Sequence, residues 1–436
     1  MRRQKSVHLF MKAVKFVGEC FKSRIARQSF CVSSRLLSCN QPTNSSVAEI
    51  KTPFIFKTRL SSSSRNTMVD TSNPYISSSS RGLTKEIEIP VPWGIIAGKV
   101  LGDSTNPPVL CIHGWLDNCN TFDNLIPMLP KDKYFVFIDL PGHGLSSGIP
   151  LGMFYTTYDY IAVIERIVNH FKWKSFSFLS HSLGGNVSGV YSGTFPEKVD
   201  KLIILDAPGI FPMTPGTEAQ MLRTAIESYA KFEKMQDKEP PVYTYDAARK
   251  KLLTANKSLN EEAADILLER GAQKLKDGKY VFVRDVRHNY RHPTAISAGS
   301  VSQFLSKIQA ETMHIMAKDG LFNTIPKERQ RVVSELIFDG FKSAEYYSRV
   351  DVEGKHHIHL CDPSGLIDHV SMHLSRPMRS ELNGQTNFQY KFIFHRIHQI
   401  NRDCSSMGNN CRQSSRRFHK STCFVHSWMV GKLQYI

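Results

Sequence analysis

The sequence lacks an uninterrupted apolar run long enough to cross a membrane, which needs about 20 consecutive apolar residues in a helix. It also has little cysteine: nine residues, six of them outside the central part of the chain. An odd and scattered set is not a disulfide framework and is typical of a reducing compartment. We therefore expect no transmembrane segment and an intracellular location, either cytoplasmic or mitochondrial.

Motifs for cofactors and metals are also missing. The sequence contains no Gly-rich loop that would cradle phosphate groups and no Cys-x-x-Cys pair. Cys404, Cys411 and Cys423 lie near His419 and His426, but without the paired spacing of a zinc site. A disordered tail is the favoured interpretation of this cluster, and we expect neither a cofactor nor a bound metal.

Acidic residues are scarce at both ends of the chain. Residues 1–81 hold 14 Lys and Arg against 3 Asp and Glu, and residues 377–436 hold 9 against 2. Residues 82–376, in contrast, carry a net charge of −1. This near-neutral centre argues against a nucleic-acid partner, and only the basic ends leave contacts with nucleic acid or membrane open.

The same division suggests the domain organisation. Residues 1–81 are rich in Arg, Lys and Ser, as in an organellar transit sequence, with a disordered extension as the alternative. Residues 377–436 lose helical and strand periodicity and are expected to be a disordered tail. Residues 82–376 should therefore form the folded domain, and the sequence does not indicate its oligomeric state.

Within this domain, short apolar runs alternate with amphipathic segments. Continuous apolar runs bounded by turn residues are typical of strands buried on both faces of a parallel sheet. Strands and helices that alternate along the chain predict an open, mostly parallel α/β sheet with ligands over the carboxyl ends of its strands. The expected elements are a hairpin at 86–101, strands at 109–112, 134–140, 176–179 and 202–205, and helices at 122–129 and 158–171.

The alternation breaks between about 208 and 298. This stretch is mainly helical, with expected helices at 217–235, 246–256 and 260–275. Strands at 313–317 and 346–352 then resume the α/β pattern, with helices at 327–339 and near 364–374. A helical segment inserted between two core strands is typical of a cap over the edge of the sheet.

Ser182 is the candidate nucleophile. It follows the predicted strand at 176–179 and precedes a predicted helix, which is the strand–turn–helix setting of a nucleophile elbow. Gly184 and Gly185 supply the small residues that a strained turn requires, whereas Ser180 stands where glycine is usual. A serine hydroxyl needs a base within hydrogen-bonding reach, and the base needs an orienting acid.

Three blocks carry a resemblance to a known family. HGWLDN at 113–118, DLPGHGLS at 139–146 and SHSLGG at 180–185 occur in the order found in the α/β-hydrolase superfamily. The chain resembles in particular its serine hydrolase-like (Kraken-type) members, over residues 85–374. The resemblance implies an α/β-hydrolase fold with helices on both faces of the sheet, a mainly helical cap, and a triad in the chain order Ser, acid, His.

The resemblance also assigns roles to individual residues. His356 lies seven positions before Pro363, as the base does in the family, whereas His357 and His359 are interpreted as its neighbours. Asp319 is the favoured acid, and Asp206 is the alternative. The oxyanion hole would combine the amides of Trp115 and Leu183. His113, Asp139 and His143 are interpreted as residues that shape loops.

The function expected from these residues is cofactor-independent acyl chemistry. A serine at the elbow fits an acyl-enzyme route to cleavage of a small carboxylic ester or thioester, with a small-molecule acyl compound as the substrate. The alternative is a catalytically silent protein that keeps the fold and binds a ligand under the cap. Ser180, Ala317 before the favoured acid, and the ambiguous acid itself motivate this alternative.

Overall fold

The computed structural model describes residues 82–377, apart from 215, 236–237, 291–295 and 343–345. The two basic tails, with the Cys404–Cys423 cluster, lie outside the described residues. No helix in the described ranges is long and apolar enough to cross a membrane.

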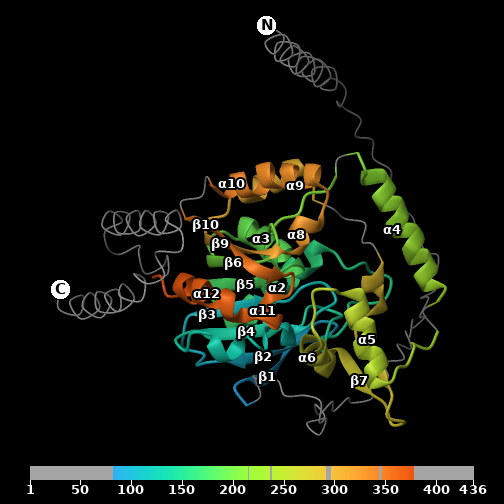
Figure 1. Cartoon of the computed structure of the whole chain (residues 1–436). Coiled ribbons are helices and arrows are strands. Elements are labelled where there is room, and N and C mark those ends of the chain that lie inside the picture. The colour runs from blue at the N-terminus through green and yellow to red at the C-terminus, as the bar shows by residue number, and fades with distance from the viewer. Residues whose placement is uncertain (1–81, 215, 236–237, 291–295, 343–345, 378–436) are drawn as a thin grey trace, which may run out of the picture. The chain divides into compact units, whose positions relative to one another are not determined.

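An eight-stranded sheet forms the centre of the described chain (Figure 1). Its strand order is β1-β2-β4-β3-β5-β6-β9-β10, and only the β1–β2 and β2–β4 pairs are antiparallel. The parallel part confirms the expected α/β fold class. The strands are β1 (Lys85–Val91), β2 (Gly94–Leu101), β3 (Pro108–Ile112), β4 (Tyr134–Ile138), β5 (Phe176–His181), β6 (Val199–Leu205), β9 (Glu311–Asp319) and β10 (Tyr347–Lys355).

Two hydrophobic cores lie on opposite faces of this sheet, because successive side chains of a strand point to opposite sides. In β5, Phe176 and Phe178 belong to one core and Leu179 to the other. The first core packs against α2 (Thr157–Phe171), α3 (Leu183–Thr194), α7 (Ala298–Leu305), α8 (Leu321–Thr324), α9 (Lys327–Val333), η4 (Ser334–Phe338) and α10 (Asp339–Lys342). The second packs against η1 (Cys119–Phe122), η2 (Ile126–Met128), α11 (Ile358–Cys361) and α12 (Ile367–Leu374).

One expected helix is replaced by two short 3₁₀ turns, η1 and η2. The prediction of a helix at 122–129 is wrong, although Phe122, Leu125 and Ile126 are buried in the second core as their spacing suggested. Pro127 lies in the first turn of η2, and Pro130 follows it. Proline lacks an N–H and disfavours a helical conformation in the residue before it, so a continuous helix cannot form here.

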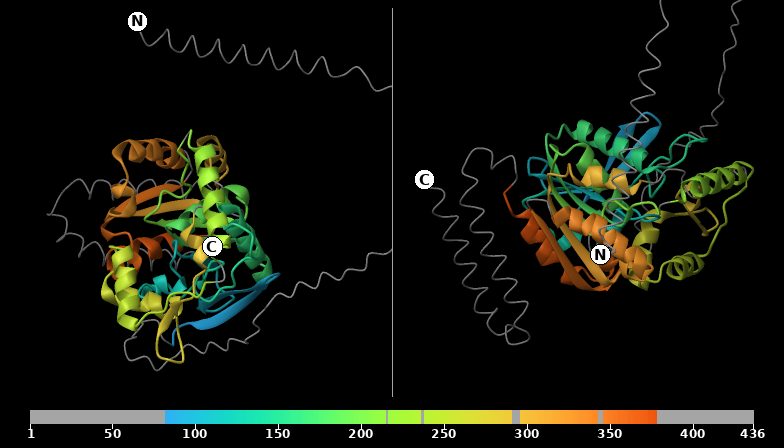
Figure 2. Two further views of the ribbon diagram at one scale, coloured as in Figure 1. Left: turned by 90° about the vertical axis from the view of Figure 1, so that its right-hand side faces the viewer. Right: turned by 90° about the horizontal axis from the view of Figure 1, so that it is seen from above.

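The insertion, residues 208–298, lies between β6 and α7. Its elements gather at one side of the sheet, as two views at right angles show (Figures 1 and 2). They are α4 (Glu218–Glu233), α5 (Tyr245–Ala255), α6 (Glu261–Gly271), the small hairpin β7 (Ala272–Lys274) with β8 (Tyr280–Phe282), and η3 (Val286–Asn289). Buried Ile266 and Leu267 of α6 pack with Leu360 of α11, so the insertion contacts the loop that follows β10.

Candidate active site

Ser182 lies at the junction of β5 and α3. Its backbone has φ 51° and ψ −111°, a strained conformation for a residue with a side chain. Its N–H donates to the Leu205 carbonyl at 3.1 Å, and its own carbonyl accepts from the Asn186 N–H at 3.2 Å. The same residue therefore ends the strand and begins the helix, as the sequence predicted for an elbow.

The glycines after Ser182 are required by close packing. A Cβ on Gly184 would lie 2.3 Å from the Ile112 carbonyl oxygen, and one on Gly185 would lie 2.7 Å from Ile204 Cγ2. Ser180, in contrast, is an ordinary residue of β5, and its φ is not positive. A glycine is therefore not needed at position 180, and the departure from the usual motif costs no backbone strain.

His356 reaches Ser182 from the loop after β10. Its Nε2 lies 3.0 Å from Ser182 Oγ, and its Nδ1 lies 2.6 Å from Asp206 Oδ2. The His356 side chain is 15% exposed, whereas the Asp206 side chain is fully buried. The structure thus brings together a hydroxyl, an imidazole and a carboxylate in the arrangement that activates a serine.

Asp206 follows β6 and is held from several sides. Its Oδ1 accepts from the Ala317 N–H and its Oδ2 from the Leu321 N–H, both at 3.0 Å. The approach is so close that a Cβ on Gly320 would lie 2.1 Å from Asp206 Oδ1. The end of β9 and the turn that follows it, residues 317–321, therefore surround the carboxylate and fix the oxygen that faces His356.

The preference for Asp319 over Asp206 is not met by this geometry. Asp319 is the exposed last residue of β9, where it pairs in register with Lys355 of β10. The residues on either side of Asp319 donate N–H groups to Asp206. The turn in which the family resemblance places the acid therefore holds the carboxylate of Asp206 in position. Asp206, the alternative, occupies the position against the imidazole.

The two amides expected to form an oxyanion hole lie at the start of α3 and in the loop after β3. Neighbouring amides are engaged elsewhere: Gly184 N–H donates to the His113 carbonyl and Leu116 N–H to His143 Nε2, at 3.1 and 3.2 Å. Among the described residues, no hydrogen bond engages the N–H of Leu183 or Trp115. Both amides remain available to an oxygen of a ligand.

His113 and His143 shape the loops beside the elbow, as expected. His113 Nδ1–H donates to the Gly114 carbonyl at 2.6 Å, and His113 Nε2 accepts from the Leu140 N–H at 2.9 Å. Burial lowers the pKa of both histidines, so each stays neutral and can accept with one nitrogen while donating with the other. These bonds link the loop after β3 to the loop after β4.

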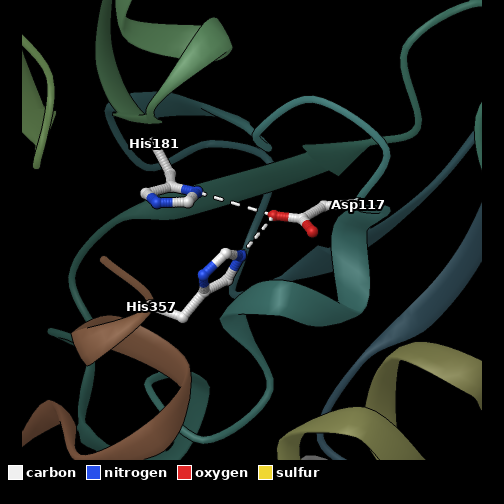
Figure 3. Close-up of side chains that lie close together, drawn as sticks. All are labelled: Asp117, His181 and His357. Carbon is white, nitrogen blue, oxygen red and sulfur yellow. Dashed lines mark hydrogen bonds and ion pairs between the residues drawn. The ribbon is translucent and has the colours of Figure 1, made fainter. Parts of the chain in front are cut away.

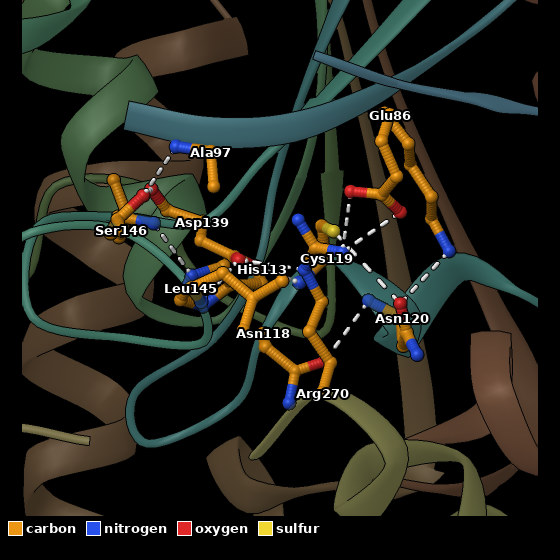
Figure 4. A network of polar contacts seen from close by, with 12 residues as sticks. Glu86, Ala97, His113, Asn118, Cys119, Asn120, Asp139, Leu145, Ser146 and Arg270 are labelled. Carbon is orange, nitrogen blue, oxygen red and sulfur yellow. Dashed lines mark hydrogen bonds and ion pairs between the residues drawn. The ribbon is translucent and has the colours of Figure 1, made fainter. Parts of the chain in front are cut away.

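A buried network joins the same loops to the insertion (Figure 4). Asp139 accepts from the N–H groups of Cys119 and Leu145, both at 2.8 Å. Arg270, in α6, donates its Nε–H to Asp139 Oδ2 at 2.7 Å and its Nη1 hydrogens to Glu86 of β1. Burial would raise the pKa of Asp139, but the Arg270 guanidinium lowers it overall. No sequence motif marks Arg270.

The chain resembles known proteins over about two thirds of its length. Residues 107–301 match the family described as the alpha/beta hydrolase fold. A "Serine hydrolase-like protein" of Danio rerio is 40% identical over 289 residues, 66% of this chain and 87% of the relative. "Serine hydrolase-like protein 2" of Homo sapiens is 38% identical over 67% of this chain and 95% of the relative.

A solved structure shares the architecture. A hypothetical protein from Pseudomonas aeruginosa superposes with a TM-score of 0.59 at 26% sequence identity, over 66% of this chain and 98% of that chain. Together with the family match, this likeness confirms the expected α/β-hydrolase fold.

Proposed function

Because the chain belongs to the α/β-hydrolase family, with serine hydrolase-like proteins as relatives, we propose that it is a serine hydrolase for small carboxylic esters or thioesters. Ser182 is the nucleophile, His356 the base and Asp206 the acid. The observation that carries the proposal is the continuous hydrogen-bonded chain from Ser182 Oγ through both His356 nitrogens to Asp206 Oδ2.

The first half-reaction forms an acyl-enzyme. Ser182 Oγ attacks the carbonyl carbon of the substrate while His356 Nε2 takes the hydroxyl proton. Asp206 holds His356 with its Nδ1–H toward the carboxylate and stabilises the imidazolium that forms. The proton then passes from Nε2 to the leaving alkoxide or thiolate as the bond between it and the carbonyl carbon breaks.

The N–H groups of Trp115 and Leu183 would donate hydrogen bonds to the carbonyl oxygen and stabilise the negative charge that develops on it. Backbone amides suit this role because they are fixed and uncharged, and one such donor lowers the barrier by about 3 kcal/mol. The start of α3 adds the positive end of its helix dipole near the same point. In the second half-reaction, His356 activates a water molecule that hydrolyses the acyl-enzyme.

The alternative of a silent binding protein has less support in the geometry. Three sequence features favour that alternative: Ser180, Ala317, and the choice between Asp319 and Asp206 as the acid. Ser180 occupies an unstrained strand position, Ala317 donates its N–H to Asp206, and Asp206 contacts His356. These departures are compatible with a working triad.

Labelling with a fluorophosphonate probe tests the proposal, with p-nitrophenyl esters of increasing acyl length as substrates. The folded chain should label and turn over an ester, and Ser182→Ala should do neither. Ser192→Ala is the matched control, because Ser192 is a buried serine of α3 outside the site. This variant should be labelled by the probe as the native chain is. A folded native chain that neither labels nor hydrolyses any ester or thioester would favour the binding protein.

A further inference from the structure

A second cluster of polar side chains, shown in Figure 3, includes His181, whose ring centroid lies 4.5 Å from that of His356. It consists of Asp117 in the loop after β3, His181 at the end of β5 and His357 before α11. Asp117 Oδ2 lies 3.6 Å from His181 Nδ1 and 3.0 Å from His357 Nε2, and the three atoms all lie within 4.8 Å of one another. All three residues are buried.

The hydrogen bonds of His181 define which of its nitrogens carries the proton. The His356 carbonyl can only accept, and it lies 3.0 Å from His181 Nε2, so Nε2 is the protonated nitrogen. With that one proton on Nε2, His181 Nδ1 carries a lone pair. This nitrogen has no hydrogen-bond partner among the described residues, and it points toward Asp117.

The surroundings of His357 favour the same arrangement. Asn256 Oδ1 accepts from both the N–H and the hydroxyl of Ser258, at 3.1 and 2.6 Å. The single Ser258 hydroxyl proton is thereby used, so Ser258 Oγ acts as the acceptor for His357 Nδ1–H at 2.7 Å. The Asn256 Nδ2 amide, a donor, lies farther from the same nitrogen, at 3.4 Å, so the shorter contact with Ser258 Oγ makes Nδ1 the donor and leaves the Nε2 lone pair facing Asp117.

The third group is a buried carboxylate. Its Oδ2 faces both rings, at 3.6 Å from His181 Nδ1 and 3.0 Å from His357 Nε2. With the ring protons placed on the opposite nitrogens, two imidazole lone pairs and a carboxylate oxygen face one another; with a proton on His357 Nε2, the 3.0 Å contact is a hydrogen bond to Asp117. A Cβ on Gly114 would lie 2.8 Å from His181 Nδ1 and 3.0 Å from Asp117 Oδ2, so the glycine leaves this space free of carbon.

We propose that Asp117, His181 and His357 bind one divalent transition-metal ion, with Zn²⁺ as the expected ion. Ligand atoms about 2.0 Å from a tetrahedral Zn²⁺ lie about 3.3 Å apart, and the separations of 3.0 and 3.6 Å lie on either side of this value. Imidazole nitrogen and carboxylate oxygen are common zinc ligands. The His356 carbonyl and Ser258 Oγ act as the outer hydrogen-bond partners that orient metal-bound histidines.

This site is separate from the proposed reaction. Neither Ser182 nor His356 is a ligand, although each is the chain neighbour of one. The ion would tie together the loop after β3, the end of β5 and the loop after β10, and its role would be to stabilise the site rather than to enter the chemistry. Metal binding is therefore expected to persist in Ser182→Ala, whatever the outcome of the labelling experiment.

The test uses the full chain produced in medium supplemented with Zn²⁺ or, separately, Co²⁺. The bound metal is counted by elemental analysis, and the cobalt protein is examined for the visible absorption of a tetrahedral ion. One metal equivalent per chain should be lost in Asp117→Asn, and Ser258→Ala should bind about 10- to 100-fold more weakly because it loses an outer partner. His373→Gln, which changes a buried histidine bonded to the Glu311 carbonyl, should keep the metal.

Metal held by the C-terminal cysteines is distinguished by a chain with Cys404, Cys411 and Cys423 changed to serine. The metal ion bound by Asp117, His181 and His357 must still be present in this variant. The spectrum of its cobalt form must lack thiolate charge-transfer absorption. Absence of metal from the folded native chain would overturn the proposal, as would a content unchanged in both Asp117→Asn and Ser258→Ala. The cluster would then be a hydrogen-bonded clamp, with His357 Nε2–H donating to Asp117.

Discussion

The triad and the proposed metal site are built from adjacent residues of the same two segments. Ser182 and His181 are neighbours at the end of β5, and His356 and His357 are neighbours after β10. Asp206 completes the first set and Asp117 the second. The His356 side chain is 15% exposed, whereas those of His181 and His357 are 0% and 3% exposed. Neighbouring positions thus place one set nearer the surface and the other inside the protein.

The difference shows how similar side chains serve unlike purposes. In the outer set, a mobile proton must pass between Ser182 Oγ and a substrate atom, so His356 keeps one nitrogen within reach of both. In the inner set, the nitrogens that point away from Asp117 are already hydrogen-bonded to protein. His181 Nε2 is bonded to the His356 carbonyl, and His357 Nδ1 to Ser258 Oγ. The inner histidines can therefore bind the proposed ion but cannot relay a proton to a ligand.

Removing the outer nucleophile should give the largest effect. Ser182→Ala should lower ester turnover by about 10⁶-fold, because the acyl-enzyme can no longer form. The fold and the metal content should stay at native levels, measured by circular dichroism and elemental analysis. Retention of full turnover would place the reaction elsewhere.

Exchanging carboxylates should separate the acid from its alternative. Asp206→Asn should lower kcat by about 10⁴-fold, because the amide no longer stabilises the imidazolium and favours the wrong tautomer. Asp319→Asn should remain near the native rate, since Asp319 is exposed and lies beside Lys355. The measurement is kcat for the same ester in both variants. A larger loss of kcat in Asp319→Asn would identify Asp319 as the acid.

Changing the inner carboxylate should affect stability more than turnover. Asp117→Asn removes the carboxylate ligand that faces His181 and His357, and should abolish the stabilisation by Zn²⁺, which is about 2.7 kcal/mol at a free Zn²⁺ concentration about 100 times the Kd, measured against the same protein in chelator. Its kcat should fall far less than that of Asp206→Asn. Denaturant titration and ester kinetics on the same sample provide the comparison, and equal losses of kcat in the two variants would mean that the sets do not have separate roles.

Acid should destabilise the fold through buried histidines outside both sets. Burial lowers the pKa of His373 from 6.5 to about 3, so the unfolded chain binds a proton that the folded chain does not. Its stabilising contribution is complete above pH 6.5 and is lost toward pH 3, by at most about 1.4 kcal/mol per pH unit. His373→Gln should flatten the dependence of unfolding free energy on pH in this window, and an unchanged slope would contradict the prediction.

Much of the fold and part of the site could be predicted from local sequence. The strands are short apolar runs, and the elbow depends on neighbours, Ser182 with Gly184 and Gly185, whose packing needs are visible in the sequence. The acid of the triad is harder to predict from sequence, because its position depends on which strand end lies nearest His356. Only the folded turn at 317–321 shows that its amides surround Asp206.

The inner cluster and the network around Arg270 could not be predicted for a related reason. Asp117, His181 and His357 are separated by 64 and 176 residues along the chain, so no spacing marks them as a set. His181 and His357 are also the chain neighbours of the expected catalytic residues Ser182 and His356, so the sequence alone does not give them a separate role. Burial and hydrogen-bond direction, which distinguish them, are properties of the folded molecule alone.

The guanidinium of Arg270 limits how freely the insertion can be exchanged between relatives. If the proposed function holds, transplanting another helical segment would be one way to change the acyl substrates of the protein. Loss of this one cation would leave Asp139, which is completely buried, as an uncompensated charge. Because Asp139 also holds the Cys119 and Leu145 amides, the disturbance would spread to the loop that presents Trp115. A chimera that keeps an arginine at this position should retain a working centre.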